Sequence, residues 1–145
     1  MKGFDLLGLP SAHETVERDD QRRPRFLGYL IRVGPASIYH PGDTVRHEAL
    51  AEALRCFPVD LAILPINGRS PGRRVPGNLT GEEAAHLARD IGSRLAVPCH
   101  YEMFAFNSAS PEPFAAGCKR LGQPFRVLGV GERLELGGGG GASQP

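Results

Sequence analysis

The 145-residue sequence has no tryptophan, no closely spaced cysteine pair and no long apolar run. Its cysteines, Cys56, Cys99 and Cys118, are odd in number and form no Cys-x-x-Cys motif, so we expect neither a disulfide framework nor a thiolate metal site. We interpret Cys99 as a buried, inert thiol. Asp5 interrupts the first apolar residues, and no segment has the length of a signal peptide core or a membrane span. These absences favour a cytoplasmic protein.

The sequence also has almost no net charge, because 17 basic residues offset 16 acidic ones to give +1. This balance excludes a general electrostatic field for nucleic acid or anionic membranes, so we expect neither as a partner. Basic residues do cluster at 22–25 and 69–74, and we interpret the first cluster as solvated loop charge. The length suits one domain that is large enough to bury a core.

Short apolar runs alternate with helical segments, and this pattern predicts an α/β fold. Thr80 and Glu83 match a capping box at the start of a helix. Residues 14–25 form a polar hairpin connection in this prediction, and 137–145 form a disordered glycine-rich tail. Strands are predicted at 4–9, 26–33, 36–39, 61–64, 95–98, 125–128 and 133–136, and helices at 47–56, 81–91 and 111–121.

Three potential metal ligands follow three of the predicted strands. His13 comes after the first strand, Asp43 after the third and His100 after the strand at 95–98. Side chains at the carboxyl ends of strands gather at one rim of an α/β sheet, where sites are usually built. Histidine and carboxylate ligands suit zinc or manganese. The convergence of all three therefore predicts a metal site that suits Zn or Mn.

Each of these residues also has a structural interpretation. Asp43 could instead cap a following helical turn, because aspartate at a helix start accepts amide hydrogen bonds. A lone histidine beside a strand is more often a hydrogen-bonded structural residue, and this holds for His13 and for His100 when each is taken alone. We interpret His40 as a residue that supports the Asp43 carboxylate or lines the pocket, and His47 as a surface residue.

A glycine-rich loop after the strand at 61–64 offers candidate substrate contacts. Asn67 carries both a donor and an acceptor, and Arg69 has a planar fork that binds phosphate or carboxylate. We interpret the apolar segment 103–107 as a cover for the site, with Asn107 as a further polar contact. The alternative is an ordinary loop whose arginines are solvated.

Taken in order, six short motifs resemble the metallo-β-lactamase-fold hydrolases, and the nearest resemblance is to the branch containing L-ascorbate-6-phosphate lactonase. The resemblance implies a four-layer αββα fold, of which 1–136 would be the carboxyl-terminal half, a mixed sheet with helices on one face. The motifs are 10–14, 28–31, 38–44, 64–69, 77–78 and 98–104.

The resemblance also implies roles for individual residues. His13 is similar to a histidine of the first metal site, Asp43 to the carboxylate that bridges two metals, and His100 to the last histidine of the second site. In that family the metals hold a hydroxide that attacks a lactone, ester or amide carbonyl or a phosphorus centre. The implied substrate is a small molecule, phosphorylated or not.

One hallmark of the family is missing, because the chain contains no His-x-His and therefore no His-x-His-x-Asp-His motif. With Asp43 shared, each metal would have at most two protein ligands, whereas a catalytic zinc normally has three. We therefore expect a truncated gene, a split gene or a misplaced start, and no activity from the chain alone. The alternative function is a non-catalytic half-domain that pairs with itself or with a separate amino-terminal half through an exposed apolar sheet face.

Overall fold

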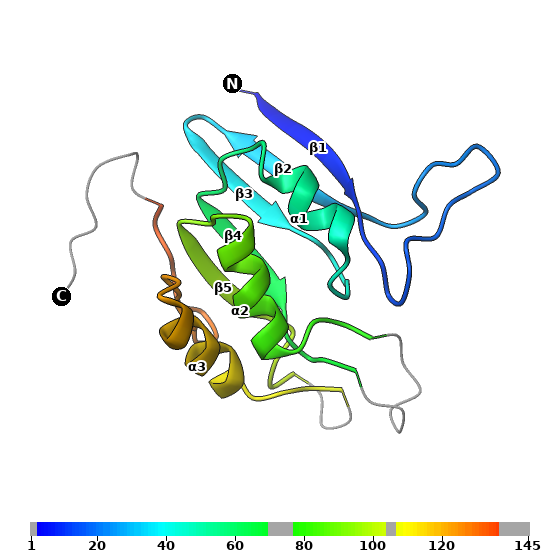
Figure 1. Cartoon of the computed structure of the whole chain (residues 1–145). Coiled ribbons are helices and arrows are strands. Elements are labelled where there is room, and N and C mark those ends of the chain that lie inside the picture. Colours follow the sequence, from blue (N-terminus) through cyan, green and yellow to red (C-terminus); the bar gives the residue numbers. More distant parts are fainter. Residues whose placement is uncertain (1–2, 70–76, 104–106, 137–145) are drawn as a thin grey trace.

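The computed structural model describes residues 3–69, 77–103 and 107–136, which form a mixed sheet flanked by helices (Figure 1). The predicted tail at 137–145 lies outside the described residues. Within the described residues the sheet has five strands in the order β1-β2-β3-β4-β5. The elements are β1 (Phe4–Pro10), β2 (Leu27–Val33), β3 (Ala36–His40), α1 (Glu48–Leu54), β4 (Leu61–Pro65), α2 (Gly81–Asp90), β5 (Leu95–Cys99) and α3 (Glu112–Leu121).

The strand directions bring four strand ends to the same side of the sheet. β1 and β3 are both antiparallel to β2, and β3, β4 and β5 are parallel to one another. β1, β3, β4 and β5 therefore run in the same direction. We call the side where they end, at Pro10, His40, Pro65 and Cys99, the carboxyl edge.

The antiparallel part of the sheet depends on two glycines. Gly34, with a φ of 57°, occupies the tight turn between β2 and β3, a conformation that favours glycine. Gly28 lies directly under the chain that leaves β3, since a Cβ at this position would be 2.5 Å from Pro41 Cα. Only glycine permits this close approach of two backbones. The residues after β3 are thereby held against β2.

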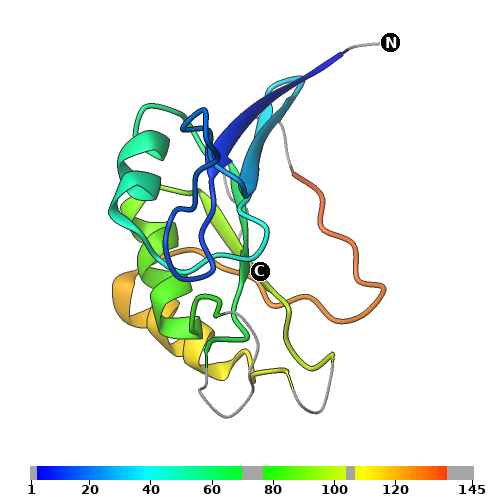
Figure 2. The ribbon, with the colours of Figure 1, turned by 90° about the vertical axis from the view of Figure 1, so that its right-hand side faces the viewer.

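The helices cover one face of the sheet, as predicted (Figure 2). α2 begins at the predicted capping box and presents an apolar stripe to the sheet. Gly81 and Gly117 let α2 and α3 approach closely, because a Cβ at Gly81 would meet the Phe114 backbone at 2.7 Å. The core under these helices includes the fully buried side chains of Leu30, Tyr39, Leu50, Leu54, Leu64, Ile66, Leu79, Leu87 and Phe114.

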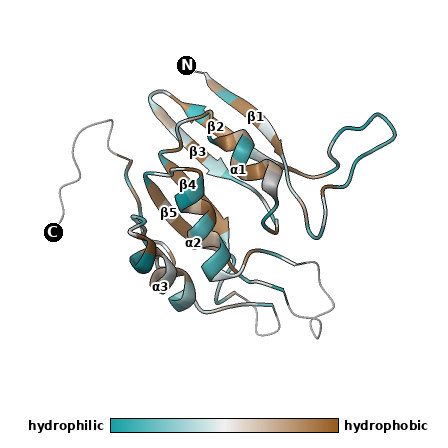
Figure 3. Cartoon of the chain, in the orientation of Figure 1, coloured by the Kyte–Doolittle hydropathy of each residue, from teal (hydrophilic) through white to brown (hydrophobic). Residues whose placement is uncertain are grey.

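Hydrophobic residues run along the strands (Figure 3), and the face of the sheet opposite the helices is unevenly covered. Near β4 and β5, Leu61 and Val97 are each only 6% exposed. The segment after α3 passes along this face (Figure 2), and the Tyr101 hydroxyl donates to the Leu128 carbonyl at 2.5 Å. On β1 and β2, by contrast, Phe4 is 64% exposed and Val33 is 49% exposed.

The predicted strands at 125–128 and 133–136 are wrong. Phe125 makes an isolated parallel bridge to Ala96, supported by hydrogen bonds of Ala96 to the residues flanking Phe125. A turn closed by the Glu132 amide and the Gly129 carbonyl, at 3.0 Å, then diverts the chain before a ladder can extend. In the part of the chain that is described, no helix has the length and apolar character needed to cross a membrane.

Candidate metal centre

His13 reaches the carboxyl edge through the residues that follow β1. The Ala12 amide donates to Thr44 Oγ1 at 3.1 Å, and the Val45 amide donates to the Ala12 carbonyl at 2.6 Å. The Ser11 hydroxyl donates to the Pro41 carbonyl. These bonds fasten the loop that carries His13 to the segment that carries Asp43. The two residues therefore come from neighbouring, hydrogen-bonded loops.

Asp43 is exposed at the turn that follows β3. The Gly42 amide donates to His40 Nδ1 at 2.9 Å, so His40 shapes the turn that precedes Asp43. The next helix, α1, has His47 as its N-cap residue, with no side-chain capping bond. Asp43 therefore lies ahead of the helix and does not cap it, which rules out the alternative interpretation and leaves its carboxylate available to a ligand.

His100 follows β5 at the same edge, in an unusual backbone conformation. Its φ is 59°, a left-handed value that residues other than glycine adopt infrequently and that recurs at functional sites. Burial, together with the nearby charge of Asp43, raises the pKa of the adjacent Cys99 thiol to about 12. The Asp43 carboxylate therefore lies close enough to the end of β5 for its charge to disfavour the Cys99 thiolate. The thiol stays protonated at neutral pH.

Ring nitrogens of three half-buried histidines lack a hydrogen-bond partner among the described residues. They are His13 Nδ1, His100 Nδ1 and His47 Nδ1, and the first two belong to candidate ligands. The His13 ring is held edge-on against Phe26, with 5.6 Å between ring centroids. A buried polar atom without a partner is costly, so these nitrogens are available to a group that this chain does not supply.

The donor chemistry suits a divalent metal, but the set is partial. His13, Asp43 and His100 are nitrogen and oxygen donors of the kind that zinc and manganese accept. Across the described ranges, however, no three histidine, cysteine, aspartate or glutamate side chains are gathered so as to hold an ion. The residues present can supply part of a metal site and not the whole of it.

His47 is not the surface residue that the sequence suggested. It is half-buried, and its Nε2 lies 3.1 Å from the Pro10 carbonyl oxygen. Burial lowers the pKa of His47, which keeps the ring neutral near physiological pH. Its contact with the last residue of β1 ties the start of α1 to the carboxyl edge.

The loop after β4 contributes a short antiparallel ladder to this edge. The Gly68 amide donates to the Leu79 carbonyl at 2.9 Å, and the Asn78 amide donates back to the Gly68 carbonyl at 3.0 Å. Asn67 and Thr80 form a further antiparallel bridge. We call the paired segments 66–69 and 77–80 the loop ladder. It gives the two candidate substrate residues on this loop a defined backbone.

The polar side chains of the loop ladder join one another. Asn67 is 2% exposed, and its Nδ2 donates to Asn107 Oδ1 at 3.0 Å. Asn78 Nδ2 donates to Asn67 Oδ1 at 2.8 Å. The structure thus joins Asn67 and Asn107, the two asparagines proposed from the sequence as substrate contacts, by a direct side-chain hydrogen bond. Sequence reasoning missed Asn78, because no local signal pairs it with Asn67.

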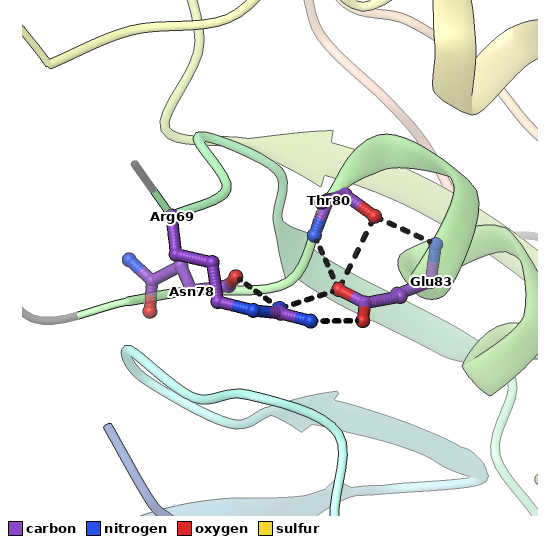
Figure 4. A network of polar contacts seen from close by, with 4 residues as sticks. All are labelled: Arg69, Asn78, Thr80 and Glu83. Atoms are coloured by element: carbon purple, nitrogen blue, oxygen red, sulfur yellow. Dashed lines mark hydrogen bonds and ion pairs between the residues drawn. The ribbon is translucent and has the colours of Figure 1, made fainter. Parts of the chain in front are cut away.

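Arg69 is engaged by an acidic partner (Figure 4). Its Nη1 and Nη2 donate to the Glu83 carboxylate at 2.8 and 2.6 Å. The Arg69 guanidinium is the main reason that the pKa of Glu83 is held below its usual range. The sequence identified Glu83 only as the acidic member of the capping box, whereas it serves both the helix start and Arg69.

Comparison with known families agrees with this architecture. A sequence profile of the β-lactamase superfamily domain matches residues 2–101. The chain therefore belongs to the metallo-β-lactamase superfamily, which confirms that part of the predicted resemblance.

The relatives in this superfamily are named UPF0173 metal-dependent hydrolases. One from Opitutus terrae is 35% identical over 112 residues, covering 75% of this chain and 44% of the relative. Another, from Methanoculleus marisnigri, is 31% identical over 142 residues, covering 93% and 59% of the two chains. The chain thus spans about half the length of the curated relatives it matches.

Among solved structures, the metallo hydrolase Igni18 from Ignicoccus hospitalis superimposes with a TM-score of 0.69 and 24% identity. The match covers 90% of this chain and 52% of Igni18. At this level of identity the likeness establishes the fold. It confirms the predicted mixed α/β sheet of a metallo-β-lactamase-like protein.

Proposed function

We propose that this chain forms the carboxyl-terminal part of a metal-dependent hydrolase and contributes His13, Asp43 and His100 to a site for one or two Zn or Mn ions. The observation that carries the proposal is the carboxyl edge, where the loops holding these residues are joined by backbone hydrogen bonds. The Val45 amide donates to the Ala12 carbonyl at 2.6 Å, which joins the first two loops. The loop after β4 joins the third, because its Leu79 and Ile66 amides donate to the Thr44 and Cys99 carbonyls at 2.8 and 3.0 Å. The names of the relatives support a hydrolase.

Each residue would have a distinct task. A divalent metal, when bound, lowers the pKa of a water molecule and stabilises negative charge developing on the substrate. Asp43, at the centre of the carboxyl edge, would be shared between two ions, with His13 and His100 on either side. Asn107 would contact a small substrate through its amide, and the buried Asn67 would orient that amide from behind. We propose a lactonase-like reaction on a lactone, ester or phosphoester, carried out in the cytoplasm.

The ligand count indicates that the site needs more polypeptide. With Asp43 shared, this chain offers at most two ligands to each ion, and a catalytic zinc usually has three protein ligands and an open position. The relatives are about twice as long as the segment matched here. We propose that the remaining ligands come from a polypeptide segment outside this sequence that carries a His-x-His-x-Asp-His motif.

Metal titration tests this proposal. We expect weak binding of Zn²⁺ or Mn²⁺ by the chain alone in calorimetry, and tight binding after addition of the amino-terminal part of a relative. Asp43→Ala should then weaken binding by about tenfold or more, which corresponds to about 1.4 kcal/mol. Asp20→Ala, at another exposed loop aspartate, is the matched control and should leave binding unchanged. Equal binding by the two variants would remove Asp43 from the site.

An activity screen on phosphorylated lactones and a generic phosphodiester completes the test. We expect turnover only in the two-part complex, because a loosely held ion cannot position a nucleophile. Tight stoichiometric metal binding with turnover by the chain alone would contradict the ligand count. It would indicate that a site assembles in another way, for example across two copies of the chain.

A second candidate function is a non-catalytic half-domain that pairs with itself or with a separately encoded amino-terminal half. The favouring observation is the uncovered apolar face of β1 and β2, where Leu6 is 55% exposed and Tyr29 is 42% exposed. Exposed patches of this kind mark association surfaces. A stable complex with the amino-terminal part of a relative that neither binds metal tightly nor hydrolyses any substrate would favour this function.

A further inference from the structure

We infer that Arg69 and Glu83 form a clamp that positions the carboxyl edge, so that Arg69 acts as a positioning residue and not as a substrate ligand. The role of this clamp in metal binding rests on the proposed function. The clamp itself rests on hydrogen bonds within the chain. It joins the loop ladder to the start of α2. None of its members is one of the proposed metal ligands.

The Glu83 carboxylate is the centre of the clamp (Figure 4). Its Oε2 accepts from Arg69 Nη1 at 2.8 Å and from the Thr80 amide at 2.9 Å, and its Oε1 accepts from Arg69 Nη2 at 2.6 Å. Thr80 Oγ1 in turn accepts from the Glu83 amide at 3.2 Å. One side chain thus fixes both the helix start and the end of the loop ladder.

Arg69 also bridges the two segments of the loop ladder. It extends from the first segment, and its Nη1 lies 3.3 Å from the Asn78 carbonyl oxygen on the second. A Cβ at Gly77 would lie 2.8 Å from the Arg69 Cβ, so the arginine stem packs directly on a glycine. Lysine could not reproduce the two-pronged bond to the carboxylate, because its ammonium is a single point charge.

The loop ladder connects the clamp to the loops of two candidate ligands. The Leu79 amide donates to the Thr44 carbonyl at 2.8 Å, one residue after Asp43. The Ile66 amide donates to the Cys99 carbonyl at 3.0 Å, one residue before His100. A shift of the loop ladder would therefore move both ligands relative to each other. The clamp keeps their spacing constant.

The same contacts argue against a substrate anion at Arg69. Both terminal nitrogens of the guanidinium already donate to Glu83, so a phosphate or carboxylate that approached this edge would have to displace a carboxylate. At the remaining edge, formed by Nε and one Nη2 hydrogen, an anion would still be repelled by the Glu83 charge at short range. The edge that best matches an anion is thus occupied.

The test compares Arg69→Gln with Arg94→Gln in the full chain. Arg94 precedes β5 and therefore lies at the edge of the sheet opposite the carboxyl edge, where it forms an ion pair with Asp60 at 3.0 Å. It serves as the matched control. We expect Arg69→Gln to accelerate amide hydrogen exchange at Ile66 and Leu79 by about tenfold, because these bonds would open locally. Arg94→Gln should leave both rates unchanged, and Arg69→Lys should give an intermediate effect.

A second readout follows the candidate ligands themselves. Adding Mn²⁺ alone should broaden the amide signals of Thr44 and His100 in the unmodified chain, and Arg69→Gln should require several-fold more Mn²⁺ for the same broadening. No broadening in the unmodified chain would overturn the proposed function, while the exchange rates would still decide the clamp. Unchanged exchange at Ile66 and Leu79 in Arg69→Gln would overturn the clamp.

Inorganic phosphate separates the clamp from an anion site. If Arg69 is a clamp, phosphate should not shift its side-chain signal, and Glu83→Gln should accelerate exchange as Arg69→Gln does. Phosphate binding that Arg69→Gln abolishes and Glu83→Gln strengthens would show that the arginine receives an anion. That outcome would overturn the inference, and it is measurable without any metal. Circular dichroism of each variant checks that the fold is retained.

Discussion

The two halves of the sheet differ in how well they are covered. β4 and β5 are buried on both faces, by α2 and α3 on one side and by the segment after α3 on the other, and Leu64 is fully buried (Figures 1 and 2). β1 and β2 are covered only on the helix side at their carboxyl-edge end. Leu9 there is 6% exposed, whereas Phe4 at the other end is 64% exposed.

The part of the sheet that provides most of the stability is therefore not the part whose apolar surface is left exposed. Burial of apolar surface is the dominant favourable term in folding, so β4, β5 and α2 should hold most of the free energy of unfolding. The β1–β2 part contributes His13 to the carboxyl edge but has an apolar surface that only a further layer would bury. The candidate metal centre thus joins a well-packed region to an incompletely covered one.

The largest expected effect comes from the covered half. Leu87→Ala, on the buried face of α2, should lower the free energy of unfolding by about 2–5 kcal/mol, because it leaves a cavity in the core. Leu6→Ala in β1 should change it by about 0.5 kcal/mol or less. Urea denaturation followed by circular dichroism measures both. Similar losses in the two variants would mean that the sheet is evenly stabilised.

A single close contact should matter in the exposed half. Gly28→Ala forces a methyl group against the Pro41 backbone, and overpacking of this kind costs about 1–3 kcal/mol. Gly8→Ala is the matched control on the neighbouring strand, where a Cβ would meet only Leu27 Cδ1 at 3.5 Å. We expect the control to be almost neutral in the same denaturation experiment. Equal costs would show that the backbone after β3 can move away.

The uncovered face should also drive association of the isolated chain. We predict oligomers in light scattering, and Leu6→Lys should weaken their association by about tenfold, or about 1.4 kcal/mol, since a charge opposes burial of the face. Val130→Lys places the same charge on an exposed loop residue and should have no effect. A fully folded monomer at all concentrations would contradict the prediction.

The smallest effect concerns acid stability. Arg69 holds the pKa of Glu83 below its usual range, so folded Glu83 stays ionised at a pH where the unfolded chain takes up a proton. The stabilisation is present above the unfolded pKa and is lost as the pH falls through the lower folded pKa. Because Arg69 is about half exposed, we expect only about 0.5 kcal/mol.

Glu83→Gln should flatten the pH dependence of stability in this acidic range. Glu52→Gln, on an exposed face of α1, provides the control and should leave the profile unchanged. Thermal melts between neutral and acidic pH measure the difference. A profile that Glu83→Gln does not alter would indicate that the ion pair contributes no free energy in solution.

Local signals in the sequence predicted most of the fold. The capping box of Thr80 and Glu83 defines the start of α2, and the short apolar runs mark all five strands of the described sheet. The failures are at 125–128 and 133–136, where apolar residues indicated strands. A strand needs a continuous partner, and in these two described segments a single residue, Phe125, forms a bridge, which is an isolated one to Ala96. The sequence does not encode where such a partner is available.

The sequence predicted at which strand ends the candidate ligands lie, whereas their meeting around a metal stays a prediction. Strand order and direction place the loops of His13, Asp43 and His100 at one edge, as their positions after apolar runs suggested. The pairing of Arg69 with Glu83 depends on the register of the loop ladder, which no spacing rule gives. Because of this register, Arg69, which the sequence suggested as a substrate contact, is bonded instead to Glu83 at the start of α2.

The connections between strands have a consequence for folding kinetics. β1, β2 and β3 are antiparallel neighbours, with a tight hairpin turn between β2 and β3 and a longer loop, 11–26, between β1 and β2. β3, β4 and β5 are joined in parallel through α1 and α2. Local hairpins close quickly, and parallel pairing waits for a longer segment to be ordered. The antiparallel meander should therefore form early, with its apolar surface in water. Partly folded chains would then aggregate through this surface before β4 and β5 are in place. The yield of refolding should therefore fall as the protein concentration rises, whatever the lifetime of the native state.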